Sequence, residues 1–184
     1  MLPCTIMITE YVRDAAATAV VFGFFASSWF GWAQEAPPKS WRTPLGIGSV
    51  IALLTAVAGG LLAWRHWSDG TVFDDDTGRS FGIVVGIEFV AAAAGAGLLA
   101  LRRRAEFISA WIAFVVGVHL FPVAVILEYP LIHVVAALVT LVAIAAIPVA
   151  RARSIPVSAA TGLGTGSVLL VAALASLVAA LTGY

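Results

Sequence analysis

The chain has 184 residues, of which 61% are hydrophobic and 11% are charged, and its mean hydropathy is +1.04. Soluble domains carry about 25% charged residues, so this composition excludes an ordinary soluble protein and predicts an integral membrane protein. Ten Lys and Arg residues balance ten Asp and Glu residues, so no excess positive charge indicates a nucleic-acid partner. The single cysteine, Cys4, excludes an intrachain disulfide.

Six apolar runs are each close to the roughly 20 residues that a helix needs to cross the hydrocarbon core of a bilayer. The predicted spans are residues 15–33, 44–64, 81–101, 105–127, 130–150 and 158–181. Residues 1–14 lack the positive n-region of a cleaved signal peptide, so the first run is predicted to be a retained helix. We therefore expect an all-α integral membrane protein, a bundle of six transmembrane helices in one domain over residues 1–184.

The first two loops differ in charge. Pro37 and Pro38 end the first helix, and Lys39 and Arg42 make the loop after it basic. The loop of residues 68–80 is acidic. Its residues 74–78 resemble the start of a calcium loop, but the closing glutamate is replaced by Val85, so we interpret this loop as a solvated connector.

The third and fourth spans form a hairpin that is closed by three consecutive arginines. The third span holds Gly82 and Gly86 at GxxxG spacing, which lets helix backbones approach closely. The fourth holds Pro122, which is predicted to kink the helix just beyond His119. The fifth span starts directly after a very tight turn, and the sixth contains no ionisable side chain.

Basic residues predict the orientation, because short loops rich in Lys and Arg stay in the cytoplasm. With six spans, one side holds Lys39, Arg42, Arg102, Arg103, Arg104, Arg151 and Arg153, and the other holds Arg13, Arg65 and Arg79. Seven against three places the arginine hairpin in the cytoplasm and both termini on the non-cytoplasmic side. The alanine-, glycine- and valine-rich composition, in which only one of the ten basic residues is lysine, favours a bacterial plasma membrane.

Glu88 and His119 are the two ionisable residues that fall inside apolar spans of the arginine hairpin. Counted from Phe81, Glu88 lies about 10 Å below the outer surface, and His119, counted back from Leu127, lies about 12 Å below it. Glu88 also lies on a helix face that is otherwise made of small residues, and this face should pack on a neighbouring helix. Since a lone carboxylate in lipid costs several kcal/mol, a contact between the two side chains is expected.

Other polar residues are predicted to lie above this pair, nearer to the outer surface. His133, Glu128 and Asp14 all fall close to the outer ends of their spans. Together they predict a polar path from the outer face to about one third of the membrane depth. Toward the inner side the sequence offers only scattered hydroxyl groups, so it indicates a half-channel or a pocket and no continuous pore.

A structural role competes with a functional one at each of these positions. Glu88 and His119 can be a buried pair that only fixes the register of two helices. His133 and Glu128 lie close enough to the interface to be simply solvated. The three arginines of the hairpin, Arg102, Arg103 and Arg104, mark topology first, with binding of anionic lipid as a second use.

Three classes of function remain open on the sequence. The first is a transporter or channel-like protein that binds a proton or a cation at Glu88 and His119. The second is a membrane enzyme acting on a lipid or quinone, with Glu88, His119 and His133 as acid/base groups or metal ligands. The third is a non-catalytic subunit, or a homo-oligomer, that associates through small-residue helix faces. A Walker loop, a dinucleotide fingerprint, an HExxH motif and a Cys/His metal pattern are all absent, so no particular cofactor is indicated.

Overall fold

The computed structural model describes residues 9–182, and this part of the chain is helical, without strands. The long helices are α1 (Val12–Ala33), α2 (Arg42–Arg65), α3 (Asp75–Leu101), α4 (Ile108–Ile126), α5 (Pro130–Arg153) and α6 (Val157–Thr182), with short 3-10 turns η2 (Lys39–Trp41) and η3 (Ala105–Phe107). All six long helices are long and apolar enough to cross a membrane. The prediction of six apolar helices is therefore confirmed, and the side on which the termini lie stays a prediction.

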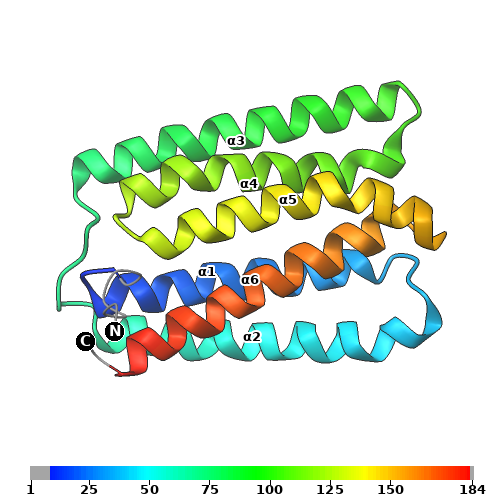
Figure 1. Ribbon diagram of the computed structural model, residues 1–184. Helices are drawn as coiled ribbons and strands as arrows, with labels where there is room; N and C mark the ends of the chain where they lie inside the picture. Colours follow the sequence, from blue (N-terminus) through cyan, green and yellow to red (C-terminus); the bar gives the residue numbers. More distant parts are fainter. Residues whose placement is uncertain (1–8, 183–184) are drawn as a thin grey trace, which may run out of the picture.

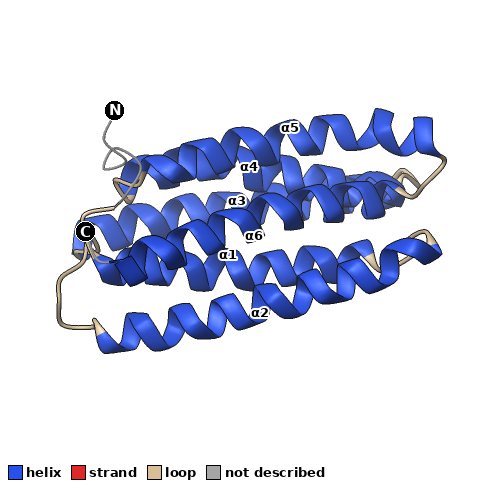
Figure 2. Ribbon diagram, turned by 60° about the horizontal axis from the view of Figure 1, so that its bottom comes forward, coloured by secondary structure: helices blue, strands red, loops and turns tan. Residues whose placement is uncertain are grey.

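The six helices run alternately up and down, side by side (Figure 1). Helix α1 packs between α2 and α6. Helix α6 also packs on α5, α5 packs on α4, and α4 packs on α3. Helices α2 and α3 are consecutive in the chain but lie at opposite edges of the bundle in the view of Figure 1. The loop that joins them crosses one end of the bundle (Figures 1 and 2). The turns from α1 to α2, from α3 to α4 and from α5 to α6 all lie at the other end.

Glycines allow the close packing of α1 with its two neighbours. A Cβ atom on Gly162 of α6 would lie 2.6 Å from the carbonyl oxygen of Trp29 in α1. On the α2 side of α1, a Cβ atom on Gly23 would lie 2.7 Å from the carbonyl oxygen of Ala52. Because no side chain fits in these places, the backbones of α1, α2 and α6 can approach closely enough to gain dispersion contacts.

Helix α3 begins six residues earlier than the predicted span. The carboxylate of Asp74 accepts a hydrogen bond of 2.7 Å from the backbone N–H of Thr77 and so caps the helix. This bond holds the pKa of Asp74 below its usual range. Residues 75–80, predicted to belong to a solvated connector, therefore form the first turns of α3. The sequence carries the signal for this cap, because aspartate is among the preferred residues at a helix N-terminus.

The other helix bounds agree with the predicted spans to within a few residues. Helix α4 continues through Pro122, and α5 continues through Pro148. The tight turns after α3, α4 and α5 are each closed by a residue in the left-handed region, namely Arg103, Glu128 and Ser154, with φ of 55°, 50° and 52°. These short turns make consecutive helices antiparallel neighbours along α3, α4, α5 and α6.

Helix α3 lies at the periphery of the bundle. None of its 27 residues is buried, and within residues 9–182 it packs mainly on α4 and η3. Large apolar side chains cover its outer side, including Ile87, Phe89 and Val90, which are 64%, 68% and 69% exposed. Such a face is typical of a helix that contacts lipid tails, and the seam between α3 and α4 is what holds α3 in the bundle.

Candidate functional site

Glu88 and His119 meet across the seam between α3 and α4. The Oε2 atom of Glu88 lies 3.2 Å from Nε2 of His119, and the two side chains are 17% and 16% exposed. The contact predicted from their matched height along two antiparallel helices is therefore present. The predicted helix face is also present. Val84, Ala91, Ala92 and Gly95 are partly buried on the same side of α3 as Glu88.

The second ring nitrogen of His119 is held by its own helix. The Nδ1 atom lies 2.8 Å from the backbone carbonyl oxygen of Val116, one turn earlier in α4. A carbonyl oxygen only accepts hydrogen bonds, so Nδ1 carries the hydrogen and donates it. Since Nδ1 is occupied, Nε2 is the ring atom that is free to exchange a proton with Glu88.

Trp111 forms a second polar link across the same seam, two turns from His119 along α4. Its indole N–H donates a hydrogen bond of 3.2 Å to the carbonyl oxygen of Ala91 in α3. The indole ring rests against Gly95, where a Cβ atom would collide with it. The sequence placed Gly95 on the correct face but did not predict the indole that fills the notch, because that contact depends on the relative rotation of two helices.

Asp14 lies apart from the Glu88/His119 pair and clamps the loop that joins α2 to α3. One carboxylate oxygen accepts a bond of 2.7 Å from the hydroxyl of Thr71, and the other accepts a bond of 2.8 Å from the backbone N–H of Val72. Beside it, Arg13 donates a bond of 3.0 Å to the carbonyl oxygen of Trp67 and lies over that indole ring. Both oxygens of Asp14 thus have a structural use.

His133 and Glu128 lie near the turn between α4 and α5, and both are exposed. The ring of His133 has its centroid 6.4 Å from that of Phe121. Glu128 occupies the left-handed position of the turn. Within residues 9–182, no hydrogen bond or ion pair joins Asp14, Glu128 or His133 to the Glu88/His119 pair. The predicted polar path therefore gains no hydrogen-bonded connection from the structure.

Buried hydroxyl groups in the half of the bundle nearer the arginine turn are a feature that sequence reasoning largely missed. The side chains of Ser109 in α4 and of Thr161 and Thr165 in α6 are 3%, 0% and 0% exposed, and their oxygens have no hydrogen-bond partner among residues 9–182. Other hydroxyls are paired, as Ser27 is with Ser49 at 2.7 Å between α1 and α2. A run of small and hydroxyl residues near the start of α6 was the available signal.

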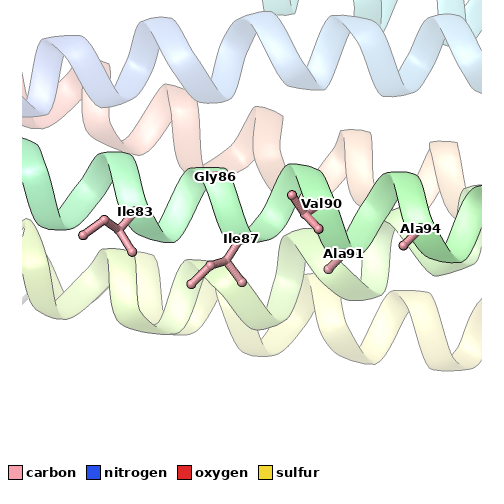
Figure 3. A pocket seen from close by; sticks show the side chains of 6 residues that line it. All are labelled: Ile83, Gly86, Ile87, Val90, Ala91 and Ala94. Atoms are coloured by element: carbon pink, nitrogen blue, oxygen red, sulfur yellow. The ribbon is translucent and has the colours of Figure 1, made fainter.

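An open groove on the outer side of α3 is apolar. It is lined by Ile83, Gly86, Ile87, Val90, Ala91 and Ala94 of this one helix (Figure 3). Glu88 is not part of its lining, because the carboxylate points toward α4. The groove is therefore distinct from the Glu88/His119 pair, and its lining chemistry suits hydrocarbon.

Within residues 9–182, no group of three or more His, Cys, Asp and Glu side chains converges as a metal site would. The Glu88/His119 pair offers two ligand atoms, whereas zinc takes three or four protein ligands. Comparisons with models of protein families, with curated proteins and with solved structures find no match to this chain.

Proposed function

We propose that this chain is a small multi-pass transport protein that binds a proton or a cation at the Glu88/His119 pair. The observation that carries the proposal is the 3.2 Å contact between two ionisable side chains on adjoining apolar helices. An ionisable residue in a membrane span is costly, by about 2.5–3.5 kcal/mol for a charged one on insertion scales, and usually marks an ion or proton pathway. Glu88 and His119 each relieve this cost for the other.

The pair suits ion binding because its net charge follows its occupancy. A carboxylate facing a neutral imidazole carries one negative charge, and a bound proton or cation neutralises it. A change of charge inside an apolar seam alters the relative free energies of alternative helix arrangements, and a ligand that favours one arrangement shifts the population toward it. This is the physical requirement for coupling ion binding to transport.

The proposed setting is a bacterial plasma membrane, with both termini outside and the arginine turn in the cytoplasm. We propose that the pair is reached from the outer side, because His119 lies seven residues from the end of α4 at Ile126 and eleven from its start at Ile108. Glu88 lies at the middle of α3, about 10 Å from Phe81, the first residue of its apolar stretch. In this orientation Arg102, Arg103 and Arg104 meet the leaflet richest in anionic headgroups, so we propose anionic lipid as their partner.

The test is flux into proteoliposomes that contain a pH-sensitive dye, under an imposed membrane potential and with a panel of small solutes. We expect Glu88→Gln and His119→Ala to abolish ion-coupled flux, because each removes one partner of the site. His133→Ala is the matched control, since this histidine is exposed on α5 and lies outside the pair. Wild-type flux in both pair variants, together with lowered thermal stability, would show that the pair only holds the two helices in register.

A further inference from the structure

The hydrogen bond inside α4 decides which atom of His119 exchanges its proton. Because Nδ1 donates to the carbonyl oxygen of Val116 at 2.8 Å, its hydrogen stays in place in both the neutral and the charged ring. The ring is thereby oriented with Nε2 toward Glu88, as happens when one histidine nitrogen is held by a backbone carbonyl. The Nε2 and Oε2 atoms are 3.2 Å apart, a distance that accommodates one hydrogen atom between them.

On the helices packed around the pair, the other ionisable side chains lie near the helix ends and away from Glu88 and His119. On α3 the remaining charges are Asp75, Asp76 and Arg79 in its first turns, and α4 has His119 alone. On α5 they are the exposed His133 in the first turn and two arginines, Arg151 and Arg153, at the other end; α6 has none. The charge of the pair therefore depends on Glu88 and His119 themselves.

We infer that the ligand of the proposed transport site is a proton, that the pair holds one proton shared between Nε2 of His119 and Oε2 of Glu88, and that its loss loosens α3 from α4. This inference rests on the proposed function for its role in transport but not for its chemistry. When the shared proton moves, the Nε2–H bond breaks and an O–H bond forms on Glu88, and the pair stays neutral in both states. A sodium or potassium ion would need several oxygen ligands, and the pair supplies one carboxylate.

The packing of α3 explains why losing the proton would loosen this helix. Without it, the carboxylate faces the bare lone pair of Nε2, and attraction across the seam becomes repulsion. Helix α3 has no buried residue that would compensate. The remaining side-chain hydrogen bond across the seam in the described residues is the one from Trp111 to Ala91. Occupancy by the proton thus controls how firmly α3 docks on α4.

The first test is nitrogen-15 magnetic resonance of the histidine rings in the full chain, reconstituted in nanodiscs. We expect Nδ1 of His119 to remain protonated at every pH, while the Nε2 signal changes with pH and not with added Na⁺ or K⁺. In Glu88→Gln the amide N–H donates to Nε2, so the ring should stay neutral and insensitive to pH. His133 serves as the internal control, because its ring is exposed on α5 and lies outside the pair. A bare Nδ1, or a shift that follows Na⁺ or K⁺ in place of pH, would overturn the inference.

The second test measures the position of α3 by electron-spin resonance. Spin labels at Phe89→Cys in α3 and Val171→Cys in α6, in a Cys4→Ala background, replace side chains that are 68% and 67% exposed. We expect the distance distribution to broaden and lengthen when high pH removes the proton, and to stay unchanged in Glu88→Gln. A control pair at Val57→Cys in α2 and Val171→Cys should not respond. A distribution for α3 that is identical at all pH values would contradict the inference.

The two tests separate the inference from the proposed function. If the resonance and distance results are as expected but flux does not depend on Glu88, the proton site stands and the transport role falls. If flux depends on Glu88 but the His119 signal follows sodium, transport stands and the assignment of the proton is wrong.

Discussion

At the scale of single residues, the bundle treats its buried hydroxyl groups in two ways. The hydroxyl of Tyr129, in the turn between α4 and α5, lies 3.0 Å from the hydroxyl of Ser176 in α6, and the two side chains are 2% and 0% exposed. This bond ties the C-terminal part of α6 to the tight turn. By contrast, the buried hydroxyl of Ser109 has no hydrogen-bond partner in the described part of the chain. The two situations predict different costs of substitution.

Removing either partner of the Tyr129 and Ser176 bond should lower stability by about 1–3 kcal/mol, because the other hydroxyl is left buried and unpaired. The double variant Tyr129→Phe with Ser176→Ala should cost less than the sum of the single changes. Thermal unfolding in detergent measures each variant. Ser109→Ala is the control and should be close to neutral, since it breaks no hydrogen bond. Additive effects of the two single changes would show that the bond contributes nothing.

At the scale of helices, the close approach of α1 to α6 depends on single glycines and can be tested directly. Gly162→Ala should destabilise the bundle by about 1–3 kcal/mol, because the new methyl group meets the backbone of Trp29 and α1 must move. Gly31→Ala in α1 is the matched control, since a Cβ there would meet nothing within 4 Å. It should raise stability by about 0.5–1 kcal/mol, as alanine favours helix more than glycine does. Equal stability of the two variants would mean that α1 and α6 do not pack as described.

The sequence predicted the positions of the helices better than it predicted which helices pack against each other. Length and hydropathy were enough for six spans, and the antiparallel hairpin was enough to bring Glu88 to His119, because both depend on residues close in sequence. The early start of α3 at Asp75 was missed because the apolar count began at Phe81. The clamp of Asp14 on Thr71 and Val72 was missed for a different reason: it joins residues more than 50 positions apart. No local pattern indicates such a contact, nor the placement of α2 and α3 at opposite edges.

At the scale of the whole molecule, charge is divided between the two ends of the bundle. The end with the turns after α1, α3 and α5 has seven basic residues against Glu35 and Glu106. The other end has three basic residues against seven acidic ones, namely Glu10, Asp14, Asp69, Asp74, Asp75, Asp76 and Glu128. Because all helices cross the full length of the bundle, this division is a property of the fold and predicts one orientation in a membrane.

Two exposed serines at opposite ends test that orientation in intact cells. In a Cys4→Ala background, a membrane-impermeant maleimide should label Ser68→Cys, in the loop after α2, and should not label Ser40→Cys, in η2, until the cells are opened. The reverse pattern would invert the topology and place the arginine turn outside. Replacing Arg102, Arg103 and Arg104 by glutamine leaves four basic residues against three, so both positions should then be labelled in part. This loss of bias is expected because basic residues in short loops are retained in the cytoplasm, whereas acidic residues contribute little to orientation.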